Sequence, residues 1–194
     1  VQAEIDNDKP LKTRQFKDSK LQEQIIAYLN SLDDQLSVVK KYSNTSAEYT
    51  NAWNEVYDKR STILKTFVDK YGLKVDSKYQ DTLDDLVRNG NSVQEKNETD
   101  QVINNLVSSA QFDRTEAEYG GYYTYSAVIE NTSKINFGNV SLLLALYDAD
   151  GLKVEETFAN TSSWAAGEKV RFEAGSDVNA AQVKVSVSGY EVTK

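Results

Sequence analysis

Histidine, cysteine and methionine are absent from this chain of 194 residues, and it contains a single proline. Without imidazoles or thiols, it cannot form a Ser-His-Asp or Cys-His nucleophile, a metal site ligated by histidine or thiolate, or a disulfide. These absences remove the chemistry of many enzymes. We therefore expect a protein that is not an enzyme, that needs no cofactor and that acts through contacts.

Positive charge is also in short supply, because 22 basic residues stand against 30 acidic ones and give a net charge of −8. Affinity for nucleic acid comes largely from clustered Lys and Arg, so we expect no nucleic-acid partner. The same balance disfavours direct docking on anionic lipid. The longest continuous apolar run, residues 142–147, has the length of a strand and not of a membrane span. We expect a membrane association only through a lipid anchor that is not part of this sequence.

The composition changes near Phe112, after which all but two of the nine glycines occur. Residues 1–20 are polar without a sustained apolar period, and we interpret them as a tether. Residues 21–112 carry helical periodicity, and residues 113–194 carry the alternation of strands. The predicted organisation is therefore a tether, a helical module and a β-rich module.

Apolar side chains recur every three or four residues from Leu21, which predicts a helix ending near Tyr42. A second stripe runs from Tyr49 to Tyr71 and includes one basic residue, Arg60. Residues 43–46 offer N-cap side chains for this second helix, and the glycine after Tyr71 is suited to a left-handed C-cap. The short connection favours an antiparallel helical hairpin.

The hairpin needs further apolar cover. We expect it from a shorter helix that carries Leu83 and Leu86 and is closed by Asn89-Gly90, and from a last helix that reaches Ala110. The start of that last helix is open between Val93 and residues 99–100, because Ser92 with Glu95 has the spacing of a capping box.

After Phe112 the apolar period becomes two, which is typical of half-buried strands. Asp148-Ala149-Asp150-Gly151 is typical of a tight hairpin turn. Five strands in about 80 residues predict a small antiparallel sandwich of immunoglobulin-like type. The predicted strands span residues 122–130, 140–148, 153–159, 168–174 and 181–189. The fold class predicted for the chain is thus α+β multidomain, with a helical hairpin or bundle followed by that sandwich.

A family resemblance lies within the β-rich module. Leu144-Ala145-Leu146-Tyr147-Asp148 resembles the signature of the FxLYD domain, a small β-sandwich of exported bacterial proteins, many of them Gram-positive lipoproteins. Residues 125–132 and 166–172 are similar to two further strands of that family. The sequence departs from the signature at Leu144, where the family has phenylalanine. The resemblance covers about residues 115–192 and implies export and residence at the cell surface, with no catalytic residues to carry over.

The most function-like local feature is a tyrosine group beside Gly120-Gly121. In a strand, Tyr123 and Tyr125 share one face and Tyr122 takes the other, so Tyr122 is a candidate for stacking on a sugar or peptide. Trp164, in the loop expected over residues 160–167, is a second candidate. The alternative, which we favour, is that these rings fill the core or an interface between the modules.

Two acidic features could in principle form a catalytic or metal-binding site. Adjacent carboxylates such as Asp33-Asp34 could divide into a catalytic acid and base, but neighbours on a helix point about 100° apart and do not converge. Asp148 and Asp150 faintly resemble a calcium loop, but the following glycine stands in the wrong place for an EF-hand. We expect solvated charge in the first case, a turn in the second, and no metal site.

The leading hypothesis is an exported, extracytoplasmic protein of the cell envelope that is anchored by an N-terminal lipid in its precursor. It would act through contacts with a protein or a cell-wall component. The sequence begins Val1-Gln2-Ala3 without an initiator methionine, which either processing of a precursor or the choice of where the chain starts would explain. The alternative is a small-ligand or glycan-binding module that uses exposed aromatic residues.

Overall fold

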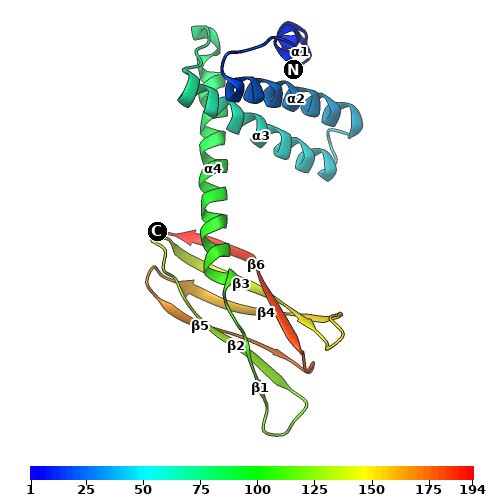
Figure 1. Ribbon diagram of the computed structural model, residues 1–194, viewed down its shortest axis with the longest axis vertical. Helices are drawn as coiled ribbons and strands as arrows, with labels where there is room; N and C mark the ends of the chain where they lie inside the picture. The colour runs from blue at the N-terminus through cyan, green and yellow to red at the C-terminus, as the bar shows by residue number, and fades with distance from the viewer. The chain divides into compact units, whose positions relative to one another are not determined.

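The computed structural model describes residues 1–194, which divide into two compact units, Val1–Asn97 and Glu98–Lys194 (Figure 1). The first unit is helical, and the second consists of the end of a helix and antiparallel sheets. The division lies inside a helix and not after Phe112 as expected. The reason is that Ile103 and Val107, on the last turns of that helix, are buried in the core of the sheets.

The helical unit follows the predicted hairpin closely. α2 and α3 lie side by side (Figure 1), and apolar side chains of both helices form one cluster. Its elements are α1 (Gln2–Asp8), the 3-10 turn η1 (Lys9–Lys12), α2 (Ser19–Lys41), α3 (Ala47–Tyr71), the 3-10 turn η2 (Ser77–Tyr79) and the first part of α4 (Gln80–Ser108).

The ends of α2 and α3 are capped by the residues that the sequence supplies there. Asp18 accepts hydrogen bonds from the backbone N–H groups of Lys20 and Leu21 at the start of α2. The Ser46 hydroxyl accepts one from Tyr49 at the start of α3, and Gly72 ends α3 with φ of 65°. Each cap pairs a backbone group that the helix itself leaves free.

The expectation of a tether over residues 1–20 was wrong. Residues 2–12 form α1 and η1 and contact α2, and Glu4 reaches Arg60 of α3. A helix of seven residues is too short for an apolar period to be recognised in the sequence. The interaction that ties this segment to α3 is also polar, the ion pair of Glu4 with Arg60.

The expectation of two separate helices after residue 79 was also wrong, because α4 runs without a break from Gln80 to Ser108. Gly90 does not end a helix. It is buried against α3, where an added Cβ atom would lie 2.7 Å from the carbonyl oxygen of Ser61. Asn89 beside it donates a hydrogen bond to Asp58 of α3 at 2.8 Å. The Asn-Gly pair therefore marks a close approach of two helices.

The second unit contains six strands in two antiparallel sheets of three, ordered β1-β2-β5 and β4-β3-β6. All five predicted strand regions are present, and the short β1 was not predicted. The strands are β1 (Asp113–Glu116), β2 (Tyr123–Glu130), β3 (Asn136–Tyr147), β4 (Lys153–Trp164), β5 (Lys169–Ser176) and β6 (Gln182–Thr193). The coarse prediction of N-terminal helices followed by antiparallel sheets is confirmed.

The two sheets share one core with the end of α4. Leu144 and Leu146 of β3 are fully buried in it, whereas Ala145 and Tyr147 alternate to the other face of β3. Asp148 then closes the predicted hairpin, because its carboxylate accepts hydrogen bonds from the N–H groups of Asp150 and Leu152.

Asn131 closes the end of this core between β2 and β3. Its side chain is fully buried, and its amide donates to the carbonyls of Ile135 and Trp164 at 2.8 and 3.0 Å. Its oxygen accepts from the backbone and hydroxyl of Ser133. The Asn-rich turn is thus an internal polar anchor.

None of the helices in the chain combines the length and apolarity needed to cross a bilayer.

Candidate functional site

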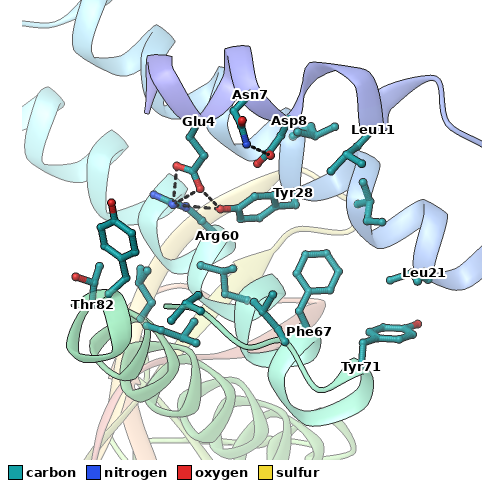
Figure 2. A pocket seen from close by; sticks show the side chains of 18 of the residues that line it. Glu4, Asn7, Asp8, Leu11, Leu21, Tyr28, Arg60, Phe67, Tyr71 and Thr82 are labelled. Atoms are coloured by element: carbon teal, nitrogen blue, oxygen red, sulfur yellow. Dashed lines mark hydrogen bonds and ion pairs between the residues drawn. The ribbon is translucent and has the colours of Figure 1, made fainter. Parts of the chain in front are cut away.

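The helical unit contains a cavity of about 940 Å³ between α1, α2, α3 and α4 (Figure 2). Most of its walls are apolar. The apolar lining includes Leu21, Ile25, Leu64, Phe67, Leu83 and Leu86. A volume of this size lies within the range of pockets that hold small organic ligands.

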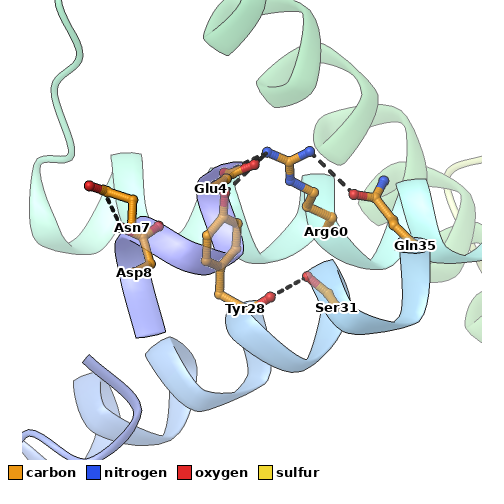
Figure 3. A network of polar contacts seen from close by, with 7 residues as sticks. All are labelled: Glu4, Asn7, Asp8, Tyr28, Ser31, Gln35 and Arg60. Atoms are coloured by element: carbon orange, nitrogen blue, oxygen red, sulfur yellow. Dashed lines mark hydrogen bonds and ion pairs between the residues drawn. The ribbon is translucent and has the colours of Figure 1, made fainter. Parts of the chain in front are cut away.

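One wall of the cavity carries a polar cluster centred on Arg60 (Figures 2 and 3). Its Nη2 atom donates to both carboxylate oxygens of Glu4, at 2.8 and 2.9 Å, and to the Tyr28 hydroxyl at 3.2 Å. Its Nη1 atom donates to the amide oxygen of Gln35 at 3.3 Å. Tyr28 also donates a hydrogen bond to Glu4. The guanidinium therefore binds one carboxylate and is oriented by neutral groups on α2.

The guanidinium of this cluster is largely removed from water, while the Glu4 side chain is 31% exposed. The Arg60 side chain is only 16% exposed, and its Nε atom is buried without a hydrogen-bond partner. Burial raises the pKa of the Tyr28 phenol above its ordinary value; the hydrogen bond to Glu4 raises it further, while Arg60 acts in the opposite direction. The phenol thus stays protonated and remains a donor beside the guanidinium.

The two residues predicted as ligand-binding candidates lie in different environments, and neither lies at this cavity. Tyr122 precedes β2 and is 52% exposed, while Tyr123 and Tyr125, on the opposite face, are buried in the core. The Tyr122 ring lies over Gly175 of β5, where an added Cβ atom would meet its hydroxyl oxygen.

The structure corrects the expected position of Trp164. This residue ends β4 and does not lie in an open loop, and its side chain is 0% exposed. Its ring contacts Phe137 and Phe172, and its indole N–H donates to the carbonyl of Glu168. Because both the ring and its polar atom are used within the fold, Trp164 offers no surface to a ligand here.

The acidic residues considered above lie in surface ion pairs and in a turn. Asp33 and Asp34 pair with different lysines, Lys12 at 3.6 Å and Lys59 at 2.8 Å, so their carboxylates do not converge. The Asp148 carboxylate is engaged by the backbone of its own turn. No group of three or more acidic side chains is arranged to hold a metal ion.

Sequence reasoning did not identify the Arg60 cluster, although one signal was present. Arg60 occupies an apolar position in the stripe of α3, and a charge in such a stripe is either at the surface or paired inside. Its partner could not be found because Glu4 lies in a segment without a recognisable period, 56 residues away in the chain.

No protein-family model matches this chain, and neither does any curated protein. Among solved structures it is similar to cj0090 of Campylobacter jejuni, with 16% identity and a TM-score of 0.28 over 41% of this chain and 84% of the other. It is also similar to the Pseudomonas fluorescens alkylpurine DNA glycosylase AlkC bound to abasic-site DNA, with 9% identity and a TM-score of 0.25. That match covers 97% of this chain and 63% of the glycosylase.

This neighbour is an enzyme, whereas we expected that the chain is not one, and that expectation is withdrawn. The physical reason is that missing histidine and cysteine exclude only mechanisms that use those side chains, and carboxylates and tyrosines remain. A likeness at this level of identity and TM-score gives no activity to this chain and carries no argument about its fold.

Proposed function

We propose that this protein is an exported component of the cell envelope that acts by binding, and that the cavity of its helical unit is the binding site. The single observation that carries the proposal is the apolar cavity of about 940 Å³ with one cluster of polar groups in its wall. An apolar cavity with a few convergent polar groups is the usual form of a small-molecule site. The partner is thus a molecule with a large apolar surface.

The proposed extracytoplasmic location rests on the family resemblance of the β-rich unit. We propose that this unit is an immunoglobulin-like sandwich of the FxLYD type, because two antiparallel sheets share one core and Leu144 and Leu146 of the signature face into it. The resemblance implies export and, in many relatives, a lipid anchor. Membrane attachment would then come from an N-terminal lipid in the precursor, with protein or cell-wall components as neighbours.

Binding at the cavity is tested by titrating the protein with dodecanol, a neutral apolar probe, in a calorimeter. We expect saturable binding that is lost in Ile25→Trp, because the new ring fills the cavity from α2. Val39→Trp is the matched control, since Val39 lies on the same helix but is 50% exposed. A flat titration of the unmodified protein, or equal binding by both variants, would show that the cavity is not the site.

The location is tested separately by fractionating the native host and analysing the mature N-terminus by mass spectrometry. We expect the protein in the envelope fraction, with a lipid-modified cysteine at its mature N-terminus. Recovery in the cytosol with an unprocessed methionine start contradicts export and leaves the binding proposal untouched.

A second candidate function is glycan binding at Tyr122, and the observation that favours it is the half-exposed ring lying against Gly175. A ring supported on one face by the sheet can stack on a sugar with the other. Titration with cell-wall glycan fragments should give binding that Tyr122→Ala abolishes and Tyr119→Ala, at a fully exposed neighbour, does not. Equal binding by the two variants would remove this candidate.

A further inference from the structure

We infer that the cavity of the helical unit takes a long-chain carboxylate, and that Glu4 of α1 occupies the position of its head group. The inference rests on the proposed binding function and specifies the ligand class. It makes α1 an internal competitor, because its carboxylate must leave Arg60 before the ligand's carboxylate can bind there. Figure 3 shows the three side chains concerned, Glu4, Tyr28 and Arg60.

Charge complementarity at Arg60 defines the head group. Arg60 is the only basic residue that lines the cavity, and its counterion is the carboxylate of Glu4. The other groups that touch its guanidinium, Tyr28 and Gln35, are neutral. The guanidinium is 16% exposed with Glu4 in place, and if α1 moves away it loses its only counterion, so another anion is favoured in the position of Glu4.

The geometry around Arg60 suits a carboxylate in particular. Two donors, the Nη2 atom of Arg60 and the hydroxyl of Tyr28, converge on the Oε1 atom of Glu4, and Nη2 also reaches the second oxygen. A ligand carboxylate can accept the same set of hydrogen bonds. The Nε atom of Arg60 is buried without a partner, so a donor remains that Glu4 does not use.

The walls beyond Arg60 define the rest of the ligand. Leu64, Phe67 and Tyr71 follow Arg60 along the same face of α3 and line the cavity (Figure 2). From Arg60 to Tyr71 the helix advances roughly 16 Å, at 1.5 Å per residue. An aliphatic chain fits such a wall, whereas a peptide would bring backbone N–H and C=O groups that find few partners there.

The way α1 is held permits its displacement. None of its residues is buried, and its N-cap, Val1, makes no side-chain capping bond. The ion pair from Glu4 to Arg60 reaches across to α3, and α1 also packs against α2 and η1. A ligand that replaces this ion pair removes the main polar attachment of α1.

The inference is tested by comparing dodecanoate with dodecanol, which have the same chain and differ in the head group. Glu4→Gln removes the competing charge, so we expect about tenfold tighter binding of dodecanoate than in the unmodified protein and dodecanol within about twofold. Asp6→Asn is the matched control, with the same change of charge at an exposed site on α1, and should leave both affinities unchanged. Glu4→Ala provides a second version of the test.

Arg60 is tested in the Glu4→Gln background, where removing the cation does not leave the carboxylate of Glu4 unpaired. Adding Arg60→Gln should lower the affinity for dodecanoate at least tenfold and leave dodecanol within about twofold. Lys59→Gln in the same background is the control, because Lys59 pairs with Asp34 at the surface. Circular dichroism of each variant verifies that the helices are intact.

The outcomes separate this inference from the function on which it rests. If dodecanol binds in the cavity but Glu4→Gln does not distinguish dodecanoate from dodecanol, the carboxylate assignment is wrong and the binding site stands. If neither probe binds to any variant, the proposed function fails and the inference with it. Tighter binding of dodecanoate in Asp6→Asn as well would indicate a general charge effect and overturn the role of Glu4.

Discussion

The helical unit and the sheet unit bury their apolar side chains to different degrees. In the sheet unit Leu142, Leu144 and Trp164 are each 0% exposed. In the helical unit the cavity-lining residues Leu64 and Phe67 keep exposures of 6% and 9%, and of its buried apolar residues only Leu32 reaches 0%. One unit has a closed core and the other has a core with space in it.

This difference has a physical consequence for the role of each unit. A protein interior at full packing density has no space for a ligand, and changing its volume is costly. A core that already contains a cavity can accept an apolar molecule without rearranging its walls. The cavity binding that we propose therefore suits the helical unit, and the sheet unit is suited to keeping a fixed shape.

The largest effect that tests this comparison is the loss of unfolding free energy when a leucine is replaced by alanine in each core. Leu144→Ala should lower the free energy of unfolding of the sheet unit by about 4 kcal/mol, because it opens a new void in a closed core. Leu64→Ala should cost the helical unit about 2 kcal/mol, because it enlarges a space that already exists. Amide hydrogen exchange in urea resolves the two units. Equal costs would mean that the cores are packed alike.

The second test concerns the contact that fixes the walls of the cavity. Gly90→Ala should destabilise the helical unit by about 1–2 kcal/mol, although alanine favours helices by about 1 kcal/mol over glycine. The new Cβ atom would lie 2.7 Å from the Ser61 carbonyl oxygen, which is backbone and cannot turn aside.

Ser92→Ala, at an exposed position on the same helix, is the control for Gly90→Ala and should stay within about 0.5 kcal/mol. Thermal unfolding of both variants makes the comparison. A Gly90→Ala protein as stable as the parent would show that α3 and α4 adjust freely, and that the cavity walls are less fixed than the structure shows.

The regular elements were predictable because their signals are local. The helix stripes, the cap at Ser46, the left-handed Gly72 and the hairpin turn at Asp148 each depend on a few neighbouring residues, and the structure contains all of them. The alternation also placed Tyr123 and Tyr125 on one face and Tyr122 on the other, and the structure buries the first two.

The features that sequence reasoning missed depend on distant partners. Gly90 was interpreted as the end of a helix, because a glycine that lets two helices approach looks the same in the sequence as one that ends a helix. Trp164 was placed in a loop because β4 extends beyond its alternating region. The candidate site needs Glu4 and Arg60 together, and only the tertiary structure joins them.

The smallest expected effect concerns the contact between α4 and the sheets, where Tyr190 donates a hydrogen bond to Asp100 at 2.6 Å. Burial, with this hydrogen bond and the charge of Asp100, raises the pKa of Tyr190 from 10.0 to about 12. The folded state therefore holds the phenolic proton more tightly than the unfolded chain. The stabilisation is complete below pH 10.0 and is lost as the pH rises through about 12.

Tyr190→Phe removes this proton and makes the effect measurable. At neutral pH the variant should be less stable by about 1 kcal/mol, the usual contribution of one hydrogen bond. That difference should shrink as the pH rises from 10.0 to about 12, because the phenol then ionises beside a carboxylate. Urea unfolding of both proteins across this range gives the difference directly, with the other tyrosines and lysines common to both. If the difference in unfolding free energy stays constant with pH, the hydrogen bond of Tyr190 to Asp100 does not stabilise the contact between α4 and the sheets. That contact then depends on the apolar packing of Ile103 and Val107.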